Sequence, residues 1–259
     1  MTSTVRYEVD GHVATITYDR PEKLNAIDGQ MRTEINAAFH RLREDEDAWV
    51  AIVTGSGRAF CVGADLGSQT GSAAGDFAGS FWERPTVNSF ESGWEIFKPV
   101  IAAVNGHCLG YGLTLVSWCD FVVASERATF GFPEVTVGIP TIVGAMRLPQ
   151  RIGWQHAMEL LLTGERIDAE RAKEIGLVGW LVAHDDLLDE AGALAARLVR
   201  AAPLAARATK EMAVRGPGMP MVDAIRFGET MRRVAGATDD AAEGVAAHRE
   251  HRPPVWRGR

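Results

Sequence analysis

One carboxylate stands out from an apolar stretch of the sequence. Glu134 follows Pro133 in ATFGFPEVTVGIP (128–140), where phenylalanines, valines and an isoleucine surround it. Proline fixes the backbone ahead of the glutamate. Desolvation in such surroundings raises the pKa of a carboxyl group, which is a frequent property of general acids and bases. The same pattern also fits a loop glutamate that reaches solvent or pairs with an arginine such as Arg147.

A second segment places two glycines inside an apolar run. In NGHCLGYGLTLVSWCD (105–120), Gly110 and Gly112 flank Tyr111, between a strand-like run and residues that can begin a helix. Glycine weakens a regular element, so its presence indicates that another group approaches the backbone closely. The start of a helix offers N–H donors and a partial positive charge, which suit an oxyanion. The alternative interpretation is close packing of two elements at the glycines.

A third segment could supply another backbone donor. In GRAFCVGADL (57–66), a strand-like end runs through Gly63 into Ala64 and Asp65. One interpretation is a turn from strand to helix, with Asp65 near the helix start. The other directs a backbone N–H, that of Ala64, at a ligand oxygen. Two such donors converging on one carbonyl oxygen form an oxyanion hole, and losing one typically costs ~3 kcal/mol of transition-state stabilisation.

The elements that must position these segments alternate between strands and helices. Apolar residues spaced by three or four predict a helix over 28–43, and the pattern becomes helical again from about residue 154. Short apolar or β-branched runs predict strands at 12–19, 49–55, 99–106, 120–125 and 176–183. This order favours an α/β fold with sheets buried on both faces. The stretch 67–92 is rich in Gly, Ser and Ala, which predicts a mobile loop or broken helix over a site.

Composition excludes several classes of protein. The 259 residues are 46% hydrophobic and 24% charged, as is usual for a soluble globular protein. The net charge of −7 argues against non-specific nucleic-acid binding. Cys61, Cys108 and Cys119 lie in apolar stretches and are odd in number, so we expect reduced core residues and no metal site. No signal peptide or membrane-spanning run is found, which predicts a soluble, cytoplasmic protein.

Taken in order, these segments resemble the crotonase superfamily, also called the enoyl-CoA hydratase/isomerase family. The resemblance covers essentially the whole chain. It is carried by RPEKLNA (20–26), AFCVGADL, NGHCLGYGLTLVSWCD, ATFGFPEVTVGIP, LTGERIDAERAKEIGLV and the closing RPPVWRGR. The family fold is a spiral of ββα units followed by a helical C-terminal region. The resemblance therefore implies a spiral core over 1–195 that holds an acyl-CoA site. It also implies a helical region over 196–259 that serves trimerisation and part of the coenzyme A pocket.

The resemblance also implies roles for individual residues. The backbone N–H groups of Ala64 and Tyr111 are the expected oxyanion donors, and Glu134 is the expected acid/base. Binding of an acyl-CoA thioester is expected to involve Lys23, Leu24, Ala26, Ala64, Asp65, Leu66, Gly110, Tyr111 and Pro133. The substrate carries the coenzyme A, so no separate cofactor or metal is expected. Family members assemble as trimers or dimers of trimers, which we expect here too.

The sequence departs from the hydratase pattern at one position. Hydratases of the family generally use two glutamates, which align with Thr114 and Glu134, so only one carboxylate is retained. Tyr111 also replaces a residue that is usually small. Adding water to a double bond uses two groups, whereas moving a double bond needs one base, so the sequence favours isomerisation. The alternatives are a hydratase with an atypical Thr114, carbon–carbon bond cleavage, and an acyl-CoA binder without activity.

Other residues could complete the site. A second carboxylate could come from Glu83, Glu91 or Glu95. Aromatic residues of 67–97 are expected to shape the acyl pocket: Phe77, Phe81, Trp82, Phe90, Trp94 and Phe97. Cations that could hold the phosphates of coenzyme A are Arg20, Lys23, Lys210, Arg252, Arg257 and Arg259. Each of these cations is at least as well explained as solvated surface charge.

Overall fold

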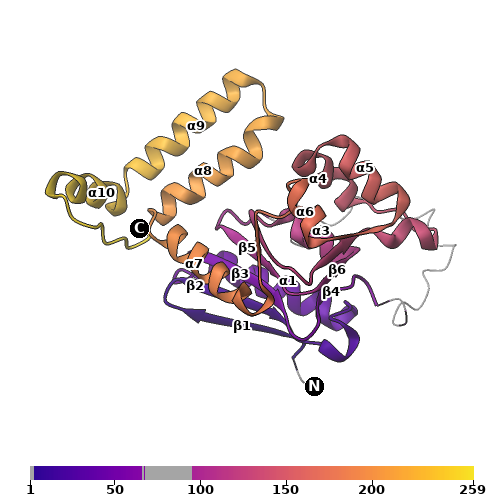
Figure 1. Ribbon diagram of the computed structural model, residues 1–259. Coiled ribbons are helices and arrows are strands. Elements are labelled where there is room, and N and C mark those ends of the chain that lie inside the picture. The colour runs from indigo at the N-terminus through magenta and orange to yellow at the C-terminus, as the bar shows by residue number, and fades with distance from the viewer. Residues whose placement is uncertain (1–2, 66, 68–94) are drawn as a thin grey trace.

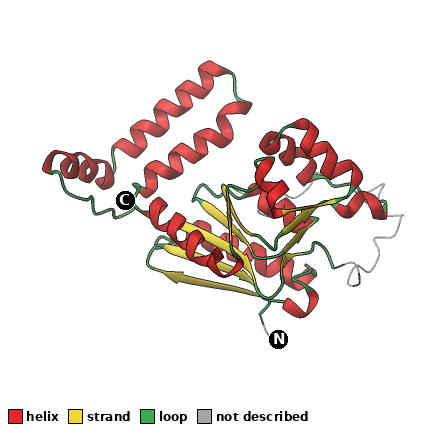
Figure 2. Ribbon diagram, in the orientation of Figure 1, coloured by secondary structure: helices red, strands yellow, loops and turns green. Residues whose placement is uncertain are grey.

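Two β-sheets form the centre of the molecule, and helices pack around them (Figures 1 and 2). The computed structural model describes residues 3–65, 67 and 95–259. The larger sheet has the strand order β1-β2-β3-β5-β7-β10. Its first two strands pair antiparallel and the other neighbours pair parallel. The strands are β1 (Val5–Asp10), β2 (Val13–Tyr18), β3 (Val50–Gly55), β5 (Val100–Val104), β7 (Phe121–Ser125) and β10 (Trp180–Val182).

The smaller sheet consists of three-residue strands in the order β4-β6-β8-β9. Each of β3, β5 and β7 is followed along the chain by a short strand of this sheet, so a two-strand unit repeats. The short strands are β4 (Ala59–Cys61), β6 (His107–Leu109), β8 (Thr129–Gly131) and β9 (Arg166–Asp168). This repeat is the spiral that the resemblance predicts, and it brings the ends of β4, β6 and β8 side by side.

Helices cover both faces of the larger sheet. Along β3, Ala51 and Val53 belong to the cluster that includes α1 (Gly29–Glu44), whereas Val50 and Ile52 belong to the cluster that includes α7 (Leu187–Val199). This alternation follows from the two-residue period of a strand. Burial on both faces explains why the sequence of β3 is continuously apolar.

Further helices follow the strands and lead to the C-terminus. The helices beside the smaller sheet are α3 (Tyr111–Trp118), α4 (Val143–Ile152), α5 (Trp154–Thr163) and α6 (Ala169–Glu174). Figure 1 shows α8 (Pro203–Arg215) and α9 (Met221–Gly236) as an antiparallel pair that projects from the sheets, followed by α10 (Asp239–Glu250). Four 3-10 helices complete the described elements: η1 (Pro21–Lys23), η3 (Pro133–Val137), η4 (His184–Asp186) and η5 (Gly216–Gly218).

The C-terminal tail returns to the body of the protein. Asp240 is 2% exposed, and its carboxylate accepts the N–H groups of Arg257 and Gly258 at 2.7 and 3.0 Å. The indole N–H of Trp256 donates to the carbonyl of Arg200 at 2.8 Å. The basic tail is therefore held in place by intramolecular contacts.

The structure confirms most of the predicted elements to within one to three residues at each end. The predicted helix over 28–43 is α1, and the predicted strands at 12–19, 49–55, 99–106 and 120–125 are β2, β3, β5 and β7. The run 176–183 contains β10. The sequence analysis did not predict β1. It also did not delimit the strands of the smaller sheet, because three residues are too few to show alternation. Apart from Gly67, the predicted loop 67–92 lies outside the described residues.

Two further predictions concern the division of the chain into two regions and the presence of membrane-spanning segments. The proposed division at residue 195 stays a prediction, and α7, which packs on the sheet, runs across it. None of the helices in the described part of the chain is long and apolar enough to span a membrane.

Candidate active site

Three segments far apart in the sequence meet at one cavity of about 220 Å³. The chain after β4, the start of α3 and the helix η3 each contribute to its wall. The lining residues are Val62, Gly63, Ala64, Gly110, Tyr111, Pro133, Glu134, Val137 and Ile139. These are the three segments whose residue types indicated chemistry. The structure therefore brings Ala64, Gly110, Tyr111, Pro133 and Glu134 together, as the sequence predicts.

The carboxylate of Glu134 lies directly over the backbone of Gly110. A Cβ atom on Gly110 would lie 3.0 Å from Oε1 of Glu134. The other oxygen, Oε2, is buried and has no hydrogen-bond partner among the described residues. Arg147, which the sequence offered as a partner, instead donates to the carbonyl of Ser117 at 3.4 Å and stacks on Trp118. Glu134 thus presents a carboxylate oxygen that the described part of the protein does not use.

The start of α3 forms the second wall of the cavity. Gly110 is the N-cap with φ of 54°, a conformation that favours glycine, and Tyr111 is the first helical residue. The N–H of Gly110 donates to the carbonyl of Gly131 in β8 at 2.9 Å, and that of Thr114 donates to Gly110 at 3.0 Å. Helix geometry directs the N–H groups of the first turn out of the helix end. Because Tyr111 lines the cavity, its position suits an oxyanion donor.

Two glycines allow the segments to touch. A Cβ atom on Gly63 would lie 3.3 Å from the backbone nitrogen of Tyr111, so the two backbones are in direct contact. A Cβ atom on Gly112 would lie 2.4 Å from the carbonyl oxygen of Cys61, a distance that real side chains do not adopt. The glycines of these two segments are therefore required by close packing, and that packing also places the backbone of Ala64 near that of Tyr111.

Ala64 is oriented by a short parallel bridge. The N–H of Ile27 donates to the carbonyl of Gly63 at 2.8 Å, and the N–H of Asp65 donates to the carbonyl of Ile27 at 2.9 Å. In a parallel bridge the central residue directs its own N–H and C=O away from its partner. Ala64 consequently faces away from Ile27, and it lines the cavity. Asp65 also accepts the N–H of Gly67 at 3.1 Å. Both interpretations of GRAFCVGADL stay predictions, because the helix expected after Asp65 would lie outside the described residues.

Comparison with known proteins identifies the family. The profile described as Enoyl-CoA hydratase/isomerase matches residues 8–259. The chain belongs to this family. A (E)-benzylidenesuccinyl-CoA hydratase of Thauera aromatica is 37% identical over 256 residues, covering 98% of this chain and 99% of the relative. A carnitinyl-CoA dehydratase of Citrobacter koseri is also 37% identical and covers all of both chains.

Solved structures of the family share the fold. A crystal structure of an enoyl-CoA hydratase/isomerase from Mycobacterium paratuberculosis is 40% identical, with a TM-score of 0.86 and 99% of each chain covered. A probable enoyl-CoA hydratase/isomerase from Mycobacterium abscessus is 36% identical, with a TM-score of 0.89 over all of both chains. The protein is therefore a crotonase-fold enzyme of a family that acts on acyl-CoA thioesters.

The loop 20–26, expected to contact coenzyme A, lies beside the cavity and does not line it. Leu24 and Asn25 both have positive φ, and Asn25 is fully buried. The Asn25 side chain accepts the N–H of Arg20 at 2.8 Å and donates to the carbonyl of Ala59 at 2.8 Å. Sequence reasoning missed this asparagine, although a buried amide that satisfies several backbone groups fixes the loop. Lys23 is exposed on this loop and Ala26 is buried.

Thr114, which the resemblance aligns with the second glutamate of the hydratases, is not among the residues that line the cavity. The residue is 5% exposed. A Cβ atom on Gly144 would lie 2.9 Å from Oγ1 of Thr114 and 2.6 Å from the ring of Phe132. Thr114, Phe132 and Gly144 thus fill one closely packed region. Leu66, Glu83 and Glu91 lie outside the described residues.

Most of the cations considered for phosphate binding are engaged in ion pairs. Lys210 pairs with Asp120 at 2.6 Å, and Arg252 pairs with Glu243 at 2.6 Å. Arg259 lies 3.6 Å from Asp239. The carboxylate of Glu95, one candidate for a second acid, contacts Arg215 at 2.5 Å. Within the described residues, no group of three or more His, Cys, Asp or Glu residues could hold a metal ion.

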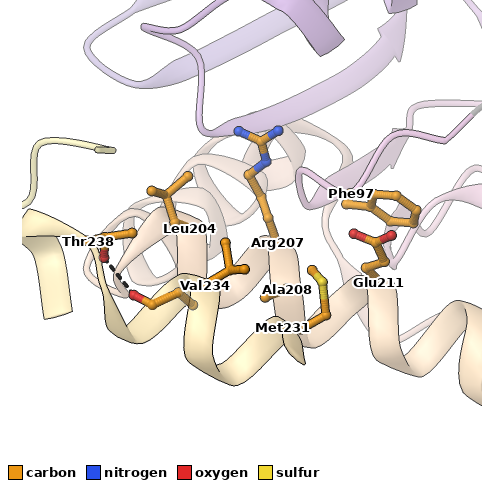
Figure 3. A pocket seen from close by; sticks show the side chains of 9 residues that line it. Phe97, Leu204, Arg207, Ala208, Glu211, Met231, Val234 and Thr238 are labelled. Carbon is orange, nitrogen blue, oxygen red and sulfur yellow. Dashed lines mark hydrogen bonds between the residues drawn. The ribbon is translucent and has the colours of Figure 1, made fainter. Parts of the chain in front are cut away.

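Phe97, which the sequence analysis expected to shape the acyl pocket, is not among the described residues that line the cavity with Glu134. It lines a separate cavity of about 240 Å³ beside α8 and α9, with Leu204, Arg207 and Met231 (Figure 3). The guanidinium of Arg215 lies 5.3 Å from the Phe97 ring centroid. The other aromatic residues of the prediction lie outside the described residues.

Proposed function

We propose that the protein isomerises enoyl-CoA thioesters, with Glu134 as the single acid/base. The backbone N–H groups of Ala64 and Tyr111 would hold the thioester oxygen. The observation that carries this proposal is the cavity wall, where Glu134 is the only carboxylate among the described lining residues. Its buried Oε2, which has no partner in that same part of the chain, is available for proton transfer.

One carboxylate is sufficient for this reaction. Glu134 takes a proton from C2 of a 3-enoyl thioester, and the electron pair of the C–H bond moves toward the thioester carbonyl. The resulting dienolate carries negative charge on oxygen, which two N–H donors stabilise. Glu134 then returns the proton to C4, and the double bond comes to lie between C2 and C3. The carboxylate regains its charge at the end, so no second base is consumed.

Hydration or dehydration is the second candidate. It is favoured by the names of relatives, among them an (E)-benzylidenesuccinyl-CoA hydratase and a carnitinyl-CoA dehydratase. In this reaction a water must be held at C3 while a proton reaches C2. With Thr114 outside the cavity wall, Glu134 would have to serve both steps, or another carboxylate would have to assist. We expect the loss of a second acid/base to slow hydration by ~10²–10⁴-fold.

A binding protein without activity is a weaker explanation. An unpaired buried polar atom is costly, and Oε2 of Glu134 has no partner in the described structure. A pure acyl-CoA binder gains nothing from that cost. The remaining expectations from the family resemblance, a homotrimer or dimer of trimers in the cytoplasm, stay predictions.

A paired assay tests the proposed function. The purified protein is given 3-enoyl-CoA and, separately, crotonyl-CoA, and the rates of isomerisation and hydration are compared. We expect isomerisation to exceed hydration, and Glu134→Gln to abolish it while leaving acyl-CoA binding intact. Glu170→Gln, on the exposed first turn of α6, is the matched control and should behave as wild type. Faster hydration than isomerisation would reject the isomerase assignment in favour of the second candidate.

A further inference from the structure

The guanidinium of Arg20 makes three polar contacts with residues near the cavity. Its Nη1 donates to the carbonyl of Ala26 at 2.8 Å and to Oδ2 of Asp65 at 2.8 Å. Its Nη2 lies 3.2 Å from Oδ2 of Asp28, the N-cap residue of α1. One guanidinium therefore contacts three acceptors in two segments, residues 26–28 and Asp65. The planar, five-donor geometry of arginine is suited to this role, and a lysine cannot reproduce it.

These contacts enclose the bridge that orients Ala64. Ala26 precedes Ile27 and Asp65 follows Ala64, so Arg20 joins the two strands of the bridge next to its hydrogen bonds. Asp65 is held at both oxygens, because Oδ1 accepts the N–H of Gly67 at 3.1 Å. The hydrogen bond from Arg20 lowers the pKa of Asp65, which keeps the carboxylate charged.

We infer that Arg20 is a positioning residue that holds the Ala64 N–H in the oxyanion hole, and that it is not a ligand for the phosphates of coenzyme A. This inference rests on the proposed function. Its side chain is 16% exposed and already faces two carboxylates, so a phosphate would have to displace one of them. Lys23, exposed on the same loop, is better placed for a phosphate.

Truncated substrates separate the two roles. Exchange of the C2 protons of butyryl-CoA in heavy water needs the base and the oxyanion hole but neither isomerisation nor water addition. S-butyrylpantetheine supports the same exchange and lacks the nucleotide phosphates. We expect Arg20→Gln to lower kcat for exchange by ~10–100-fold with both thioesters, short of the ~10²–10³-fold cost of losing an oxyanion donor completely. KM should change by less than about threefold, because ground-state contacts are kept.

Further variants guard against misfolding as an explanation. Asp65→Asn weakens the same link from the other side and should lower kcat in the same direction. The double variant should be less impaired than the product of the two single effects, because both remove one interaction. Arg20→Lys should lie between wild type and Arg20→Gln. Arg6→Gln is the matched control, since Arg6 is half-exposed, pairs with Asp19 at 3.1 Å and does not line the cavity, and its kinetics should equal those of wild type.

Two outcomes would overturn the inference. If Arg20→Gln raises KM for butyryl-CoA but not for S-butyrylpantetheine, with kcat unchanged, Arg20 is a phosphate ligand. If the folded variant behaves as wild type with both thioesters, Arg20 does not position the hole. Absence of exchange in the wild-type protein is a different result, because it rejects the proposed proton transfer itself.

Discussion

Replacing Gly112 by alanine tests whether the start of α3 lies at the reacting centre. A Cβ atom at this position would lie 2.4 Å from the carbonyl oxygen of Cys61 and 2.9 Å from its Cβ atom. Ordinary van der Waals contact begins near 3.4 Å. Both atoms belong to Cys61 in β4 of the smaller sheet, and neither can move by a side-chain rotation. The helix start and β4 must therefore separate by about 1 Å, which is the distance needed to restore that contact.

This displacement is large for a hydrogen bond. Moving the Tyr111 N–H by about 1 Å from a typical donor–acceptor distance of about 2.9 Å takes it out of the hydrogen-bonding range. The loss of one oxyanion donor typically lowers kcat by ~10²–10³-fold. Overpacking of a filled interior costs a further ~1–3 kcal/mol of folding stability. We therefore expect Gly112→Ala to remain folded at a lower unfolding temperature and to lose most of its turnover.

The assay combines kcat for C2-proton exchange with thermal unfolding followed by circular dichroism. Gly192→Ala is the control, because a Cβ atom there meets nothing within 4 Å in the middle of α7. We expect it to retain wild-type kinetics and to gain ~0.5–1 kcal/mol of stability. A folded Gly112→Ala protein with wild-type kcat would refute the placement of the oxyanion hole at Tyr111.

Two further predictions concern buried side chains. Thr114→Glu places a carboxylate at the hydratase position. We expect this variant to be less stable and to gain no hydratase activity, because Phe132 and Gly144 leave the longer side chain no room. Thr114→Val should have nearly wild-type kinetics. Burial raises the pKa of the Cys61 thiol and of the Cys119 thiol to about 12 each, so both stay protonated and unreactive at pH 8. A thiol-reactive dye should label no cysteine in the native protein and all three in denaturant; rapid native labelling would contradict the burial.

The sequence predicted those parts of the site whose signals are local. Glu134 could be identified because its apolar neighbours are adjacent in the chain. The glycines at 110 and 112 could be identified because glycine in an apolar run requires an explanation. Each of these segments carries its own pattern, and the structure places all of them at one cavity.

The contacts between segments could not be predicted in this way. The bridge between Ile27 and Ala64 joins residues that no periodicity connects. Charge alone suggested Arg20 as a phosphate ligand, because a sequence shows a cation but not the acceptors that surround it. The strands β4, β6 and β8 escaped prediction for a related reason. Each is three residues long and exists through its pairing with the others.

The character of the cavity wall bears on which reaction is faster. Apart from Glu134 and Tyr111, the lining residues in the described structure are glycines or carry apolar side chains. A water positioned for attack at C3 needs two to four polar partners to be held in place. In the proposed mechanism, the dienolate would need only two backbone donors and one carboxylate, for which Ala64, Tyr111 and Glu134 are the candidates among the lining residues. Apolar side chains beside those donors also strengthen their interaction with the developing charge, because electrostatic interactions are stronger where the local dielectric is low. We therefore expect this wall to favour return of the proton to carbon over addition of water.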